Sequence, residues 1–330
     1  MENNWTVGAL LRTSTAYWRS CALQAGVRLG IFTAIADGHH HLADIARTTR
    51  ADERGCEYLL NALTAMGLLG KHGEYYENSL AASEHLCRGS SGYIGHIILH
   101  HHHILDGWAQ LHEAVLSGGP VNMRSHGEEI ERESFLMGMF NLAMGIAPQL
   151  APLIDLSGCR RLLDLGGGPG TYAIHFCLTN PDLTAVIFDR PTTRPFAEQT
   201  VARFDLADRI TFHGGDFHRD PISGGPFDAA WLSHILHSSG PEECRRIIAK
   251  TVAAMKPGGL IMIHEFILDD SKDGPEFAAL FSLNMLVNNE EGRSYSDAEL
   301  RAMLSEAGVR NISRHPFQGP NQSGIICGLT

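Results

Sequence analysis

The sequence has little positive charge and no CxxC pair of cysteines. Its 330 residues include 26 lysines and arginines against 37 aspartates and glutamates, which gives a net charge of -11 at pH 7. Because affinity for a phosphate backbone comes mainly from basic side chains, this balance disfavours a nucleic-acid partner. The seven cysteines are scattered, odd in number and without a CxxC motif, so we expect reduced thiols in a cytoplasmic protein.

Two kinds of apolar segment are also missing. The N-terminal residues do not follow the order of a secretion signal, and no apolar run reaches the roughly 18 residues of a membrane span, so we expect no membrane partner. What is present is an ordinary globular composition, 44% hydrophobic and 19% charged, and a length that fits about two domains. Histidine is unusually frequent, at 19 residues.

Residues 1–95 predict a small, mainly helical domain. "SCALQAGVRLGIFTAIADG" has apolar residues at helical spacing with a stop at Gly38, and residues 42–66 predict two short helices joined by a turn. "GLLGKHGEYYEN" then predicts two short strands around a turn, which completes the pattern of a winged helix. The second predicted helix, about 52–66, has little positive charge and much apolar surface, which favours dimerisation over DNA recognition.

Residues 96–156 predict further helices, with a loop at 119–129, and form a helical linker. From Arg161 onward, short apolar runs alternate with helical segments, which is the pattern of βαβ units. We therefore expect a Rossmann-like, doubly wound α/β domain with a mostly parallel sheet over residues 157–330. Its seven strands are predicted at 161–165, 184–188, 209–212, 227–232, 259–266, 310–315 and 323–329.

A glycine-rich turn connects the first of these strands to its helix. In "LLDLGGGPGTYAIH", Asp164 is followed by glycines at 166, 168 and 170, and glycines at such a turn let a ligand approach the backbone closely. Thr171 stands where a dinucleotide-binding GxGxxG motif has its last glycine. The turn alone therefore indicates a nucleotide cofactor without identifying it.

Later strand ends narrow the identity of this ligand. Asp189, at the end of the second strand, is suited to the two hydroxyls of a ribose. Asp216 and Phe217, in "HGGDFHRD" after the third strand, offer a hydrogen-bond acceptor and an apolar face for an adenine. A helix end, a Pro-Gly-Gly turn and a fifth strand follow in "AAMKPGGLIMIHE".

In this order the motifs resemble those of the class I S-adenosylmethionine-dependent methyltransferases. More narrowly, "LLDLGGGPGTYA", "FDRP", "GGDF" and "SHILH" resemble the hydroxyindole/caffeate-type small-molecule O-methyltransferases, including their bacterial natural-product branch, from about residue 10 to 325. The resemblance implies a winged-helix-like dimerisation domain, a homodimer, and an acceptor pocket between the domains that the partner subunit partly closes. It also implies S-adenosylmethionine as cofactor and S-adenosylhomocysteine as product, bound by Asp164, Gly166, Gly168, Gly170, Asp189, Arg190, Asp216, Phe217 and Ser233.

The resemblance implies two catalytic residues. His237, the second histidine of "SHILH", matches the family's general base, and Glu265 matches the carboxylate that orients it. A histidine suits this role because it titrates near neutral pH, whereas a phenol of pKa about 10 stays mostly un-ionised there. In-line transfer of a methyl group also requires the enzyme to hold the reacting atoms collinear.

The chain departs from the family pattern at two places. Ser238 and Ser239 replace the usual Asp-Trp after the base, and Ser294 stands at the position of a second acid, with Glu290 and Glu291 nearby but displaced. The acid–base set is therefore incomplete. Catalysis is expected to depend more on positioning, or on an acceptor more acidic than an ordinary phenol.

The acceptor pocket is expected to draw on residues of several helices. In "HHHH", His100 and His103 lie on one helical face with His96 and can contact the acceptor or form ordinary surface. Imidazoles also suit transition metals, but no Cys or acidic ligand lies nearby at a recognised spacing, and no bound metal is expected. The predicted pocket residues are His100, His103, Trp108, Phe135, Met139, Phe140, Met144, His234, Asn284, Met285 and Asn288.

The expected function is transfer of a methyl group to a hydroxyl of a small aromatic or heteroaromatic metabolite. The serine replacements keep a second possibility open, a C-methyltransferase of tetrapyrrole-like metabolites or a relative that binds the cofactor without methyl transfer. A third, a winged-helix regulator that senses the cofactor, is disfavoured by the acidic balance and by the presence of both His237 and Glu265.

Overall fold

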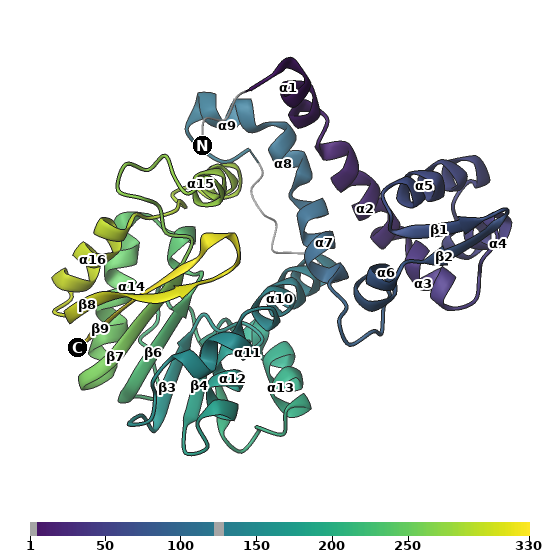
Figure 1. The fold of residues 1–330 in the computed structure, drawn as a ribbon. Coiled ribbons are helices and arrows are strands. Elements are labelled where there is room, and N and C mark those ends of the chain that lie inside the picture. The colour runs from purple at the N-terminus through teal and green to yellow at the C-terminus, as the bar shows by residue number, and fades with distance from the viewer. Residues whose placement is uncertain (1–4, 122–128) are drawn as a thin grey trace. The chain divides into compact units, whose positions relative to one another are not determined.

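The computed structural model describes residues 5–121 and 129–330 and divides into two compact units (Figure 1). Unit 1 comprises residues 1–103 and 129–141, and unit 2 comprises residues 104–128 and 142–330. The segment predicted as a helical linker, 96–156, is thus shared between the units. The predicted loop at 119–129 lies mostly outside the described residues, and the domain boundaries stay predictions.

Unit 1 is mainly helical with one hairpin. Asp52 starts the second helix of the predicted pair, because its carboxylate accepts a hydrogen bond from the Gly55 amide at 3.0 Å. Phe32, Leu60 and Tyr76 form part of its buried core. Its elements are α1 (Val7–Ser14), α2 (Tyr17–Leu29), α3 (Ile31–Ala36), α4 (Leu42–Thr49), α5 (Glu53–Ala65), β1 (Leu69–His72), β2 (Tyr75–Asn78), α6 (Leu80–His85), α7 (Gly95–His103) and most of α10 (Glu129–Met144). The predicted helix–turn–helix and hairpin are confirmed as α4, α5, β1 and β2.

One predicted helix of unit 1 is interrupted. The helical pattern that we extended to Gly38 breaks at Gly30, whose φ of 76° ends α2 before α3 begins. Glycine adopts this left-handed conformation without strain and commonly ends helices. The apolar spacing continues through the break, so periodicity alone did not reveal it.

Unit 2 contains a seven-stranded sheet of order β5-β4-β3-β6-β7-β9-β8. The first five strands in this order are parallel, and β9 is antiparallel to both of its neighbours, β7 and β8. This confirms the predicted doubly wound α/β fold with a mostly parallel sheet. The strands are β3 (Arg161–Leu165), β4 (Thr184–Asp189), β5 (Ile210–Gly214), β6 (Phe227–Ser233), β7 (Met255–Glu265), β8 (Arg310–Gln318) and β9 (Gly324–Leu329).

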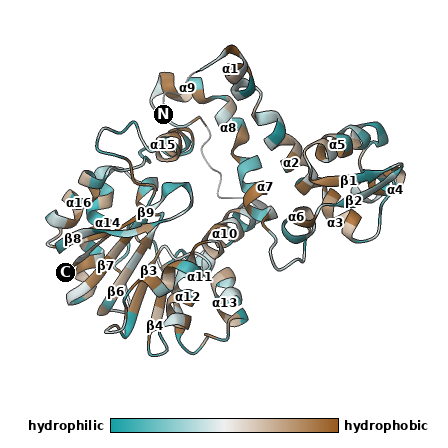
Figure 2. Cartoon of the chain, in the orientation of Figure 1, coloured by the Kyte–Doolittle hydropathy of each residue, from teal (hydrophilic) through white to brown (hydrophobic). Residues whose placement is uncertain are grey.

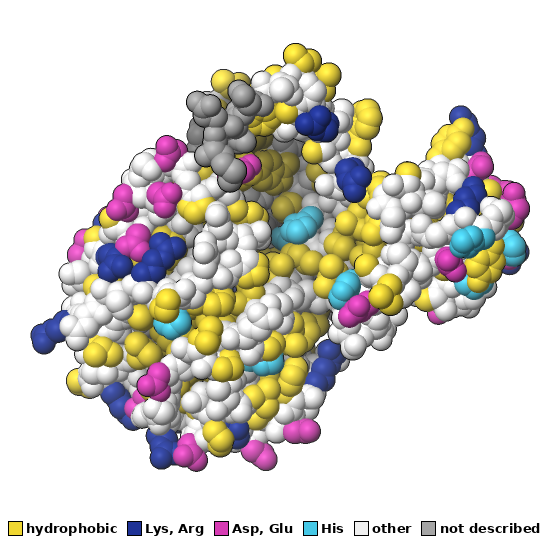
Figure 3. All heavy atoms as spheres, in the orientation of Figure 1, with side chains coloured by type: hydrophobic (Ala, Val, Ile, Leu, Met, Phe, Trp, Pro, Cys, Tyr) yellow, Lys and Arg dark blue, Asp and Glu magenta, His cyan; other side chains and the backbone are white. Residues whose placement is uncertain are grey.

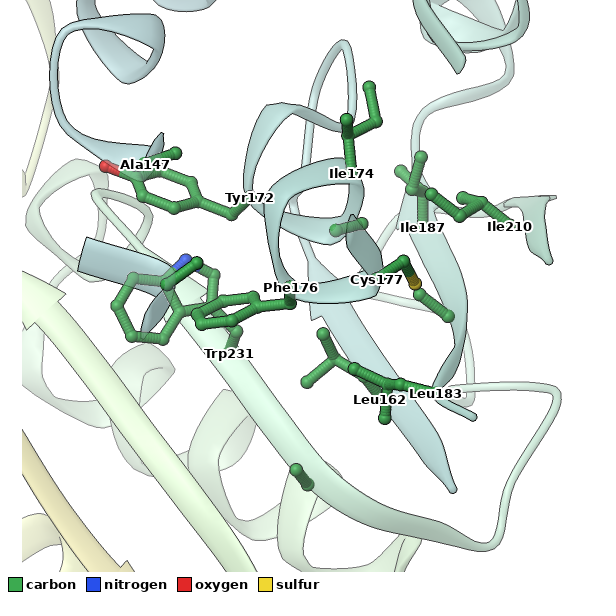
Figure 4. Close-up of a cluster of buried hydrophobic side chains, with 14 of the residues drawn as sticks. Ala147, Leu162, Tyr172, Ile174, Phe176, Cys177, Leu183, Ile187, Ile210 and Trp231 are labelled. Atoms are coloured by element: carbon green, nitrogen blue, oxygen red, sulfur yellow. The ribbon is translucent and has the colours of Figure 1, made fainter. Parts of the chain in front are cut away.

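Helices cover both faces of this sheet, whose strands are the most hydrophobic part of the unit (Figure 2). On one face, Tyr172 and Phe176 pack on Trp231 at ring-centroid distances of 5.1 and 5.2 Å (Figure 4). The α-helices are α8 (Leu105–Ala109), α9 (Leu111–Ser117), α11 (Ala147–Leu150), α12 (Thr171–Thr179), α13 (Arg194–Arg203), α14 (Pro241–Ala253), α15 (Glu276–Asn288) and α16 (Asp297–Glu306). Short 3-10 turns lie at Ala151–Leu153, Pro191–Thr193, Leu236–Ser238 and Pro320–Gln322.

The Pro-Gly-Gly segment is not a turn before the fifth strand, as we expected, but part of it. β7 starts at Met255, and its pairing with β6 is irregular between Phe227 and Ala229, where Met255 and Leu260 are the partners. Gly258, at φ 78°, lies in this irregularity. A β-bulge accommodates the additional residues of β7 between Met255 and Leu260, so the strand continues through them.

Among the described residues, the segment Arg132–Leu153 is long and apolar enough to cross a membrane by length and composition alone. In the structure it is interrupted, since α10 ends at Met144 and α11 begins at Ala147. Core helices of globular proteins pass the same test, so the absence of a membrane partner stays a prediction.

Candidate active site

The turn between β3 and α12 is where we predicted cofactor binding. Gly166, Gly168 and Gly170 have positive φ values of 64°, 55° and 82°. Side chains are strained in this left-handed region, so the backbone conformation itself requires glycine. A Cβ atom at Gly168 would meet no atom within 4 Å, so the turn is open at that point.

Asp164 lies beneath this turn and is 1% exposed. Its carboxylate accepts a hydrogen bond from the Ala173 amide at 3.2 Å. Burial raises the pKa of Asp164 to about 7, and the charge of Asp189 acts in the same direction. Gly167 was not among the predicted site residues, yet a Cβ there would lie only 2.5 Å from the carboxyl carbon of Asp164. Glycine at 167 therefore makes room for this buried carboxyl group.

Asp189, at the end of β4, is tied to the same turn. Its Oδ2 accepts a hydrogen bond from the Gly168 amide at 2.8 Å. Its Oδ1 accepts from the Arg190 amide at 2.6 Å and from Thr193 Oγ1 at 3.3 Å. Arg190 thus contributes its backbone, while its side chain is exposed. Thr193 was missed, because a threonine in a loop carries no recognisable signal.

Three loops converge on Gly166. A Cβ there would lie 2.6 Å from Ile235 Cγ2, after β6, and 3.3 Å from Phe217 Cε1, after β5. Asp216 caps its own turn, since its Oδ1 accepts a hydrogen bond from the His218 amide at 2.9 Å. The carboxyl ends of neighbouring parallel strands thus meet around one open turn, which fits a nucleotide-like ligand.

Ser233 belongs to a polar network inside unit 2. Its Oγ lies 3.0 Å from His264 Nδ1, and His264 Nε2 lies 3.0 Å from Ser323 Oγ. His264 is fully buried, and burial lowers its pKa well below 6.5, so its ring is neutral. His264 was not among the predicted site residues, because a single histidine within an apolar strand carries no distinguishing sequence signal. The role of Ser233 in cofactor binding stays a prediction.

His237 and Glu265 form a close pair at the ends of β6 and β7. His237 Nδ1 lies 2.8 Å from Glu265 Oε2, and Glu265 Oε1 accepts hydrogen bonds from the amides of Leu236 at 3.0 Å and His237 at 3.3 Å. Glu265 is only 2% exposed. Burial on its own would raise the pKa of Glu265, but the two nearby imidazoles, His237 foremost, outweigh it and lower that pKa. Glu265 is therefore an ionised carboxylate that orients an imidazole.

His234 faces the same carboxylate. Its Nδ1 is buried, has no hydrogen-bond partner among the described residues and lies 3.4 Å from Glu265 Oε2. Its φ of 55° is unusual for a residue with a side chain. The backbone is held there by its amide, which donates to the His264 carbonyl at 2.9 Å, and its ring packs 4.4 Å from that of Phe266.

His234, His237 and Glu265 together form a possible binding site for one metal ion. One ligand atom from each of His234, His237 and Glu265 lies within 4.8 Å of the others. Two imidazoles and a carboxylate are a donor set that transition metals accept. The sequence-based expectation that the protein needs no metal stays a prediction.

Two of the three serines at the departing positions, Ser238 and Ser294, form hydrogen bonds elsewhere in unit 2, whereas the buried Ser239 Oγ has no hydrogen-bond partner among the described residues. Ser238 Oγ donates to the Ile235 carbonyl at 2.8 Å, and Ser294 Oγ donates to the Ala278 carbonyl at 2.8 Å. Glu291 lies against Gly240, where a Cβ would be 2.3 Å from its Oε2. Beside this segment is an open cleft of about 610 Å³, lined by His218, Arg219, Ser238, Ser239, Gly240, Glu243, Arg246, Asn289, Glu290 and Glu291. Ser238 and Ser294 therefore do not substitute for a second acid beside His237.

Three of the predicted acceptor-pocket residues of unit 2, Trp108, Asn284 and Asn288, are linked by hydrogen bonds. Trp108 Nε1 donates to Asn284 Oδ1 at 3.0 Å, and Asn288 Nδ2 donates to the Asn284 carbonyl at 2.8 Å. Met285, next along α15, is buried. Met144 has a different partner, since its sulfur lies 3.4 Å from His175 Nε2.

The remaining predicted pocket residues lie in unit 1. His100 packs against Phe135 at a ring-centroid distance of 5.4 Å, and Met139 and Phe140 are half-buried on α10. His103 is half-buried on α7. The structure thus groups these residues within each unit, and their joint role in one pocket stays a prediction.

The chain is similar to known methyltransferases over nearly its whole length. A profile of the O-methyltransferase domain matches residues 103–310, and one of the O-methyltransferase dimerisation domain matches residues 11–88. A 3-hydroxy-5-methyl-1-naphthoate 3-O-methyltransferase of Streptomyces sahachiroi is 35% identical, across 96% of this chain and 93% of that protein. OxyT of Streptomyces rimosus, an N,N-dimethyltransferase, is 31% identical across 92% of this chain and 90% of its own. The crystal structure of human N-acetylserotonin methyltransferase in complex with SAM matches with a TM-score of 0.86 at 25% identity, covering 100% of this chain and 99% of that one.

Proposed function

The chain belongs to the O-methyltransferase family, and we propose that His237 is the general base of its reaction. The protein is a methyltransferase that uses S-adenosylmethionine. We further propose that the acceptor is a hydroxyl group of a small aromatic or heteroaromatic metabolite. The observation that carries the proposal is the short contact between His237 and the buried, ionised Glu265.

The geometry of the pair explains how His237 acts as a base. Glu265 accepts a hydrogen bond from His237 Nδ1, which leaves the lone pair of the neutral ring on Nε2. Nε2 would then take the proton of the acceptor hydroxyl. The acceptor oxygen would gain the methyl group, and the sulfur of the broken C–S bond would leave as the neutral thioether of S-adenosylhomocysteine. The resulting imidazolium is stabilised by the negative charge of Glu265. The backbone amides on Glu265 Oε1 keep this carboxylate in place throughout.

The cofactor supplies a methyl group on a sulfonium, which makes that carbon an electrophile. The open turn at Gly168 would lie under its methionine and ribose parts, with Asp164 at the edge and Asp189 on the ribose hydroxyls. Phe217 and Asp216 would contact the adenine. These groups supply no acid–base chemistry, so their contribution is to hold the methyl carbon in line with the acceptor oxygen.

We also propose a homodimer in the cytoplasm. The dimerisation-domain match covers α2 to α6, and hydrophobic side chains stand on the surface over α1 and α2 (Figure 3). Trp5, Leu11 and Trp18 are 59%, 63% and 62% exposed. A second copy of the chain would cover this apolar surface, as exposed patches of this kind do at interfaces.

The test is transfer of a labelled methyl group from S-adenosylmethionine to a panel of phenols, pyrroles, tetrapyrroles and aromatic amines. We expect methyl ethers from one or more phenols and formation of S-adenosylhomocysteine in equal amount. A methylated amine or carbon would replace the hydroxyl proposal with an N- or C-methyltransferase, and the N-methylating relative OxyT is the reason to include amines. Tight cofactor binding with specific retardation of duplex DNA at physiological salt would support the regulator instead.

A further inference from the structure

We propose that His234, His237 and Glu265 form a site for a divalent transition metal of the Zn²⁺ class, and that metal binding there inhibits the enzyme. Metal binding does not depend on the role of His237 as the base. The inhibition does, and therefore rests on the proposed function.

The ligand atoms already lie close to the spacing that such an ion needs. A tetrahedral Zn²⁺ with bonds of about 2.0–2.1 Å places its ligand atoms roughly 3.4 Å apart. Glu265 Oε2 lies 2.8 Å from His237 Nδ1 and 3.4 Å from His234 Nδ1. One ligand atom from each of the three residues lies within 4.8 Å of the others. A small movement of the two rings would complete the arrangement.

The surroundings hold these ligands in place. Two backbone amides on Oε1 of Glu265 leave Oε2 directed at the imidazoles. The His234 ring is packed at 4.5 Å against His264 and at 4.4 Å against Phe266, and the His237 ring at 4.8 Å against Phe281. Fixed ligand orientation of this kind supports metal binding.

His234 gives the strongest indication of a ligand. Its Nδ1 is buried, points toward the carboxylate and has no hydrogen-bond partner in the described part of the chain. A buried polar atom without a partner is costly, and so is the backbone conformation at φ 55° that holds it there. A metal ion bound to Nδ1 would satisfy that atom, and Glu265 supplies the compensating negative charge.

Metal binding and catalysis use opposite tautomers of His237. The proposed base needs its proton on Nδ1, facing Glu265, so that Nε2 can accept a proton. A metal ion on Nδ1 requires the lone pair at that atom, and the proton of the neutral ring then moves to Nε2. Nε2 is then a donor and no longer accepts the proton of the acceptor hydroxyl. No proton is gained or lost overall, yet the base is blocked.

The test measures binding and inhibition separately on the full-length protein. Co²⁺ titration should give the intense visible absorption of a tetrahedral site, Zn²⁺ should displace it, and Zn²⁺ should inhibit methyl transfer reversibly on addition of EDTA. Mg²⁺, which prefers oxygen ligands, should do neither. The His234→Gln and Glu265→Gln variants should bind at least about 10–100-fold more weakly, since loss of an outer-shell partner alone costs that much.

Two variants control for the many other histidines. His218 lies 3.2 Å from Glu243 without a second imidazole in the pair, and His101 lies in the histidine run of α7. His218→Gln and His101→Gln should leave the tetrahedral Co²⁺ absorption and its affinity unchanged. A spectrum that survives His234→Gln, with the variant folded by circular dichroism, would overturn the site. Tight binding at the site without inhibition would overturn the inhibitory role and would count against His237 as the base.

Discussion

Two neighbouring parts of the sheet's carboxyl edge, called here the cofactor edge and the base edge, differ in how their polar groups are held. At the cofactor edge, after β3, β4 and β5, the Asp189 carboxylate is bound by backbone amides, and glycines with positive φ shape the turn. At the base edge, after β6 and β7, one carboxylate faces two imidazoles, and Ser294 is bonded elsewhere. Backbone amides hold the carboxylate at both places, Asp189 at one and Glu265 at the other. The difference is that a glycine-rich backbone turn forms most of the cofactor edge, whereas two imidazole side chains complete the base edge.

This difference predicts different consequences of mutation. Loss of one contact at the cofactor edge leaves other contacts to the same ligand, so binding should weaken but persist. At the base edge the proposed proton transfer depends on one ring, so loss of that ring should abolish most of the rate while cofactor binding stays intact.

The largest expected effect is that of His237→Ala. The kcat for methyl transfer should fall about 10²–10⁴-fold, the usual cost of removing a general base. The affinity for S-adenosylhomocysteine, measured by calorimetry, should change by less than a few-fold. Retention of kcat within a few-fold of the wild-type value would show that the base edge does not depend on His237.

Asp189→Ala should weaken cofactor binding about tenfold to a hundredfold. Hydrogen bonds to a charged group contribute about 1.5–3 kcal/mol, and each 1.4 kcal/mol is a factor of ten. At saturating cofactor, kcat should stay near the wild-type value. Calorimetry with S-adenosylhomocysteine measures the affinity.

Asp182→Ala is the matched control, because Asp182 is exposed and forms only a surface ion pair with Arg160 at 2.8 Å. Its affinity for S-adenosylhomocysteine should equal that of the wild type. Equal affinities for the Asp189→Ala and Asp182→Ala variants would remove Asp189 from the cofactor site.

The cofactor edge was the more predictable of the two because its signals are local. Turn chemistry predicts the roles of the glycines at 166, 168 and 170. The alternation of short apolar runs with helical segments predicts both the sheet and the carboxylate at the end of β4. The supporting residues Gly167 and Thr193 were missed, since their contacts with Asp164 and Asp189 exist only after folding.

The base edge was less predictable because its contacts join distant segments. The family resemblance pointed to His237 and Glu265. Which side chains contact His234, Ser238 and Ser294 depends on side-chain rotamers, which the sequence does not specify. The break at Gly30 and the bulge in β7 show the same limit, because apolar spacing continues through both.

A smaller effect is expected from the pH dependence of cofactor binding. Burial raises the pKa of Asp164 to about 7, so this carboxyl group is protonated below pH 7 in the free protein. The ammonium group of the cofactor favours the ionised form, so binding below pH 7 requires loss of that proton. Affinity for S-adenosylhomocysteine should therefore fall about tenfold from pH 8 to pH 6.

The Asp164→Asn variant isolates this contribution. It should bind more weakly than the wild type at pH 8, and its affinity should be nearly constant between pH 8 and pH 6. If Asp164→Asn keeps the full pH dependence of binding, that dependence arises from the titration of another group. Circular dichroism at each pH checks that the fold is intact.

The smallest expected effect is that of removing metal ions. The proposed proton transfer runs from the acceptor hydroxyl to His237 Nε2, with Glu265 as the only charge that the imidazolium needs beside it. Dialysis against EDTA should therefore leave kcat unchanged, or raise it slightly where trace Zn²⁺ was bound at His234, His237 and Glu265. Loss of activity on dialysis, restored by added Zn²⁺ but not by Mg²⁺, would make the base edge a catalytic metal centre. The missing ion would then explain why the acid–base set at the base edge is incomplete. The base edge would differ from the cofactor edge by a bound metal and not only by its imidazole side chains.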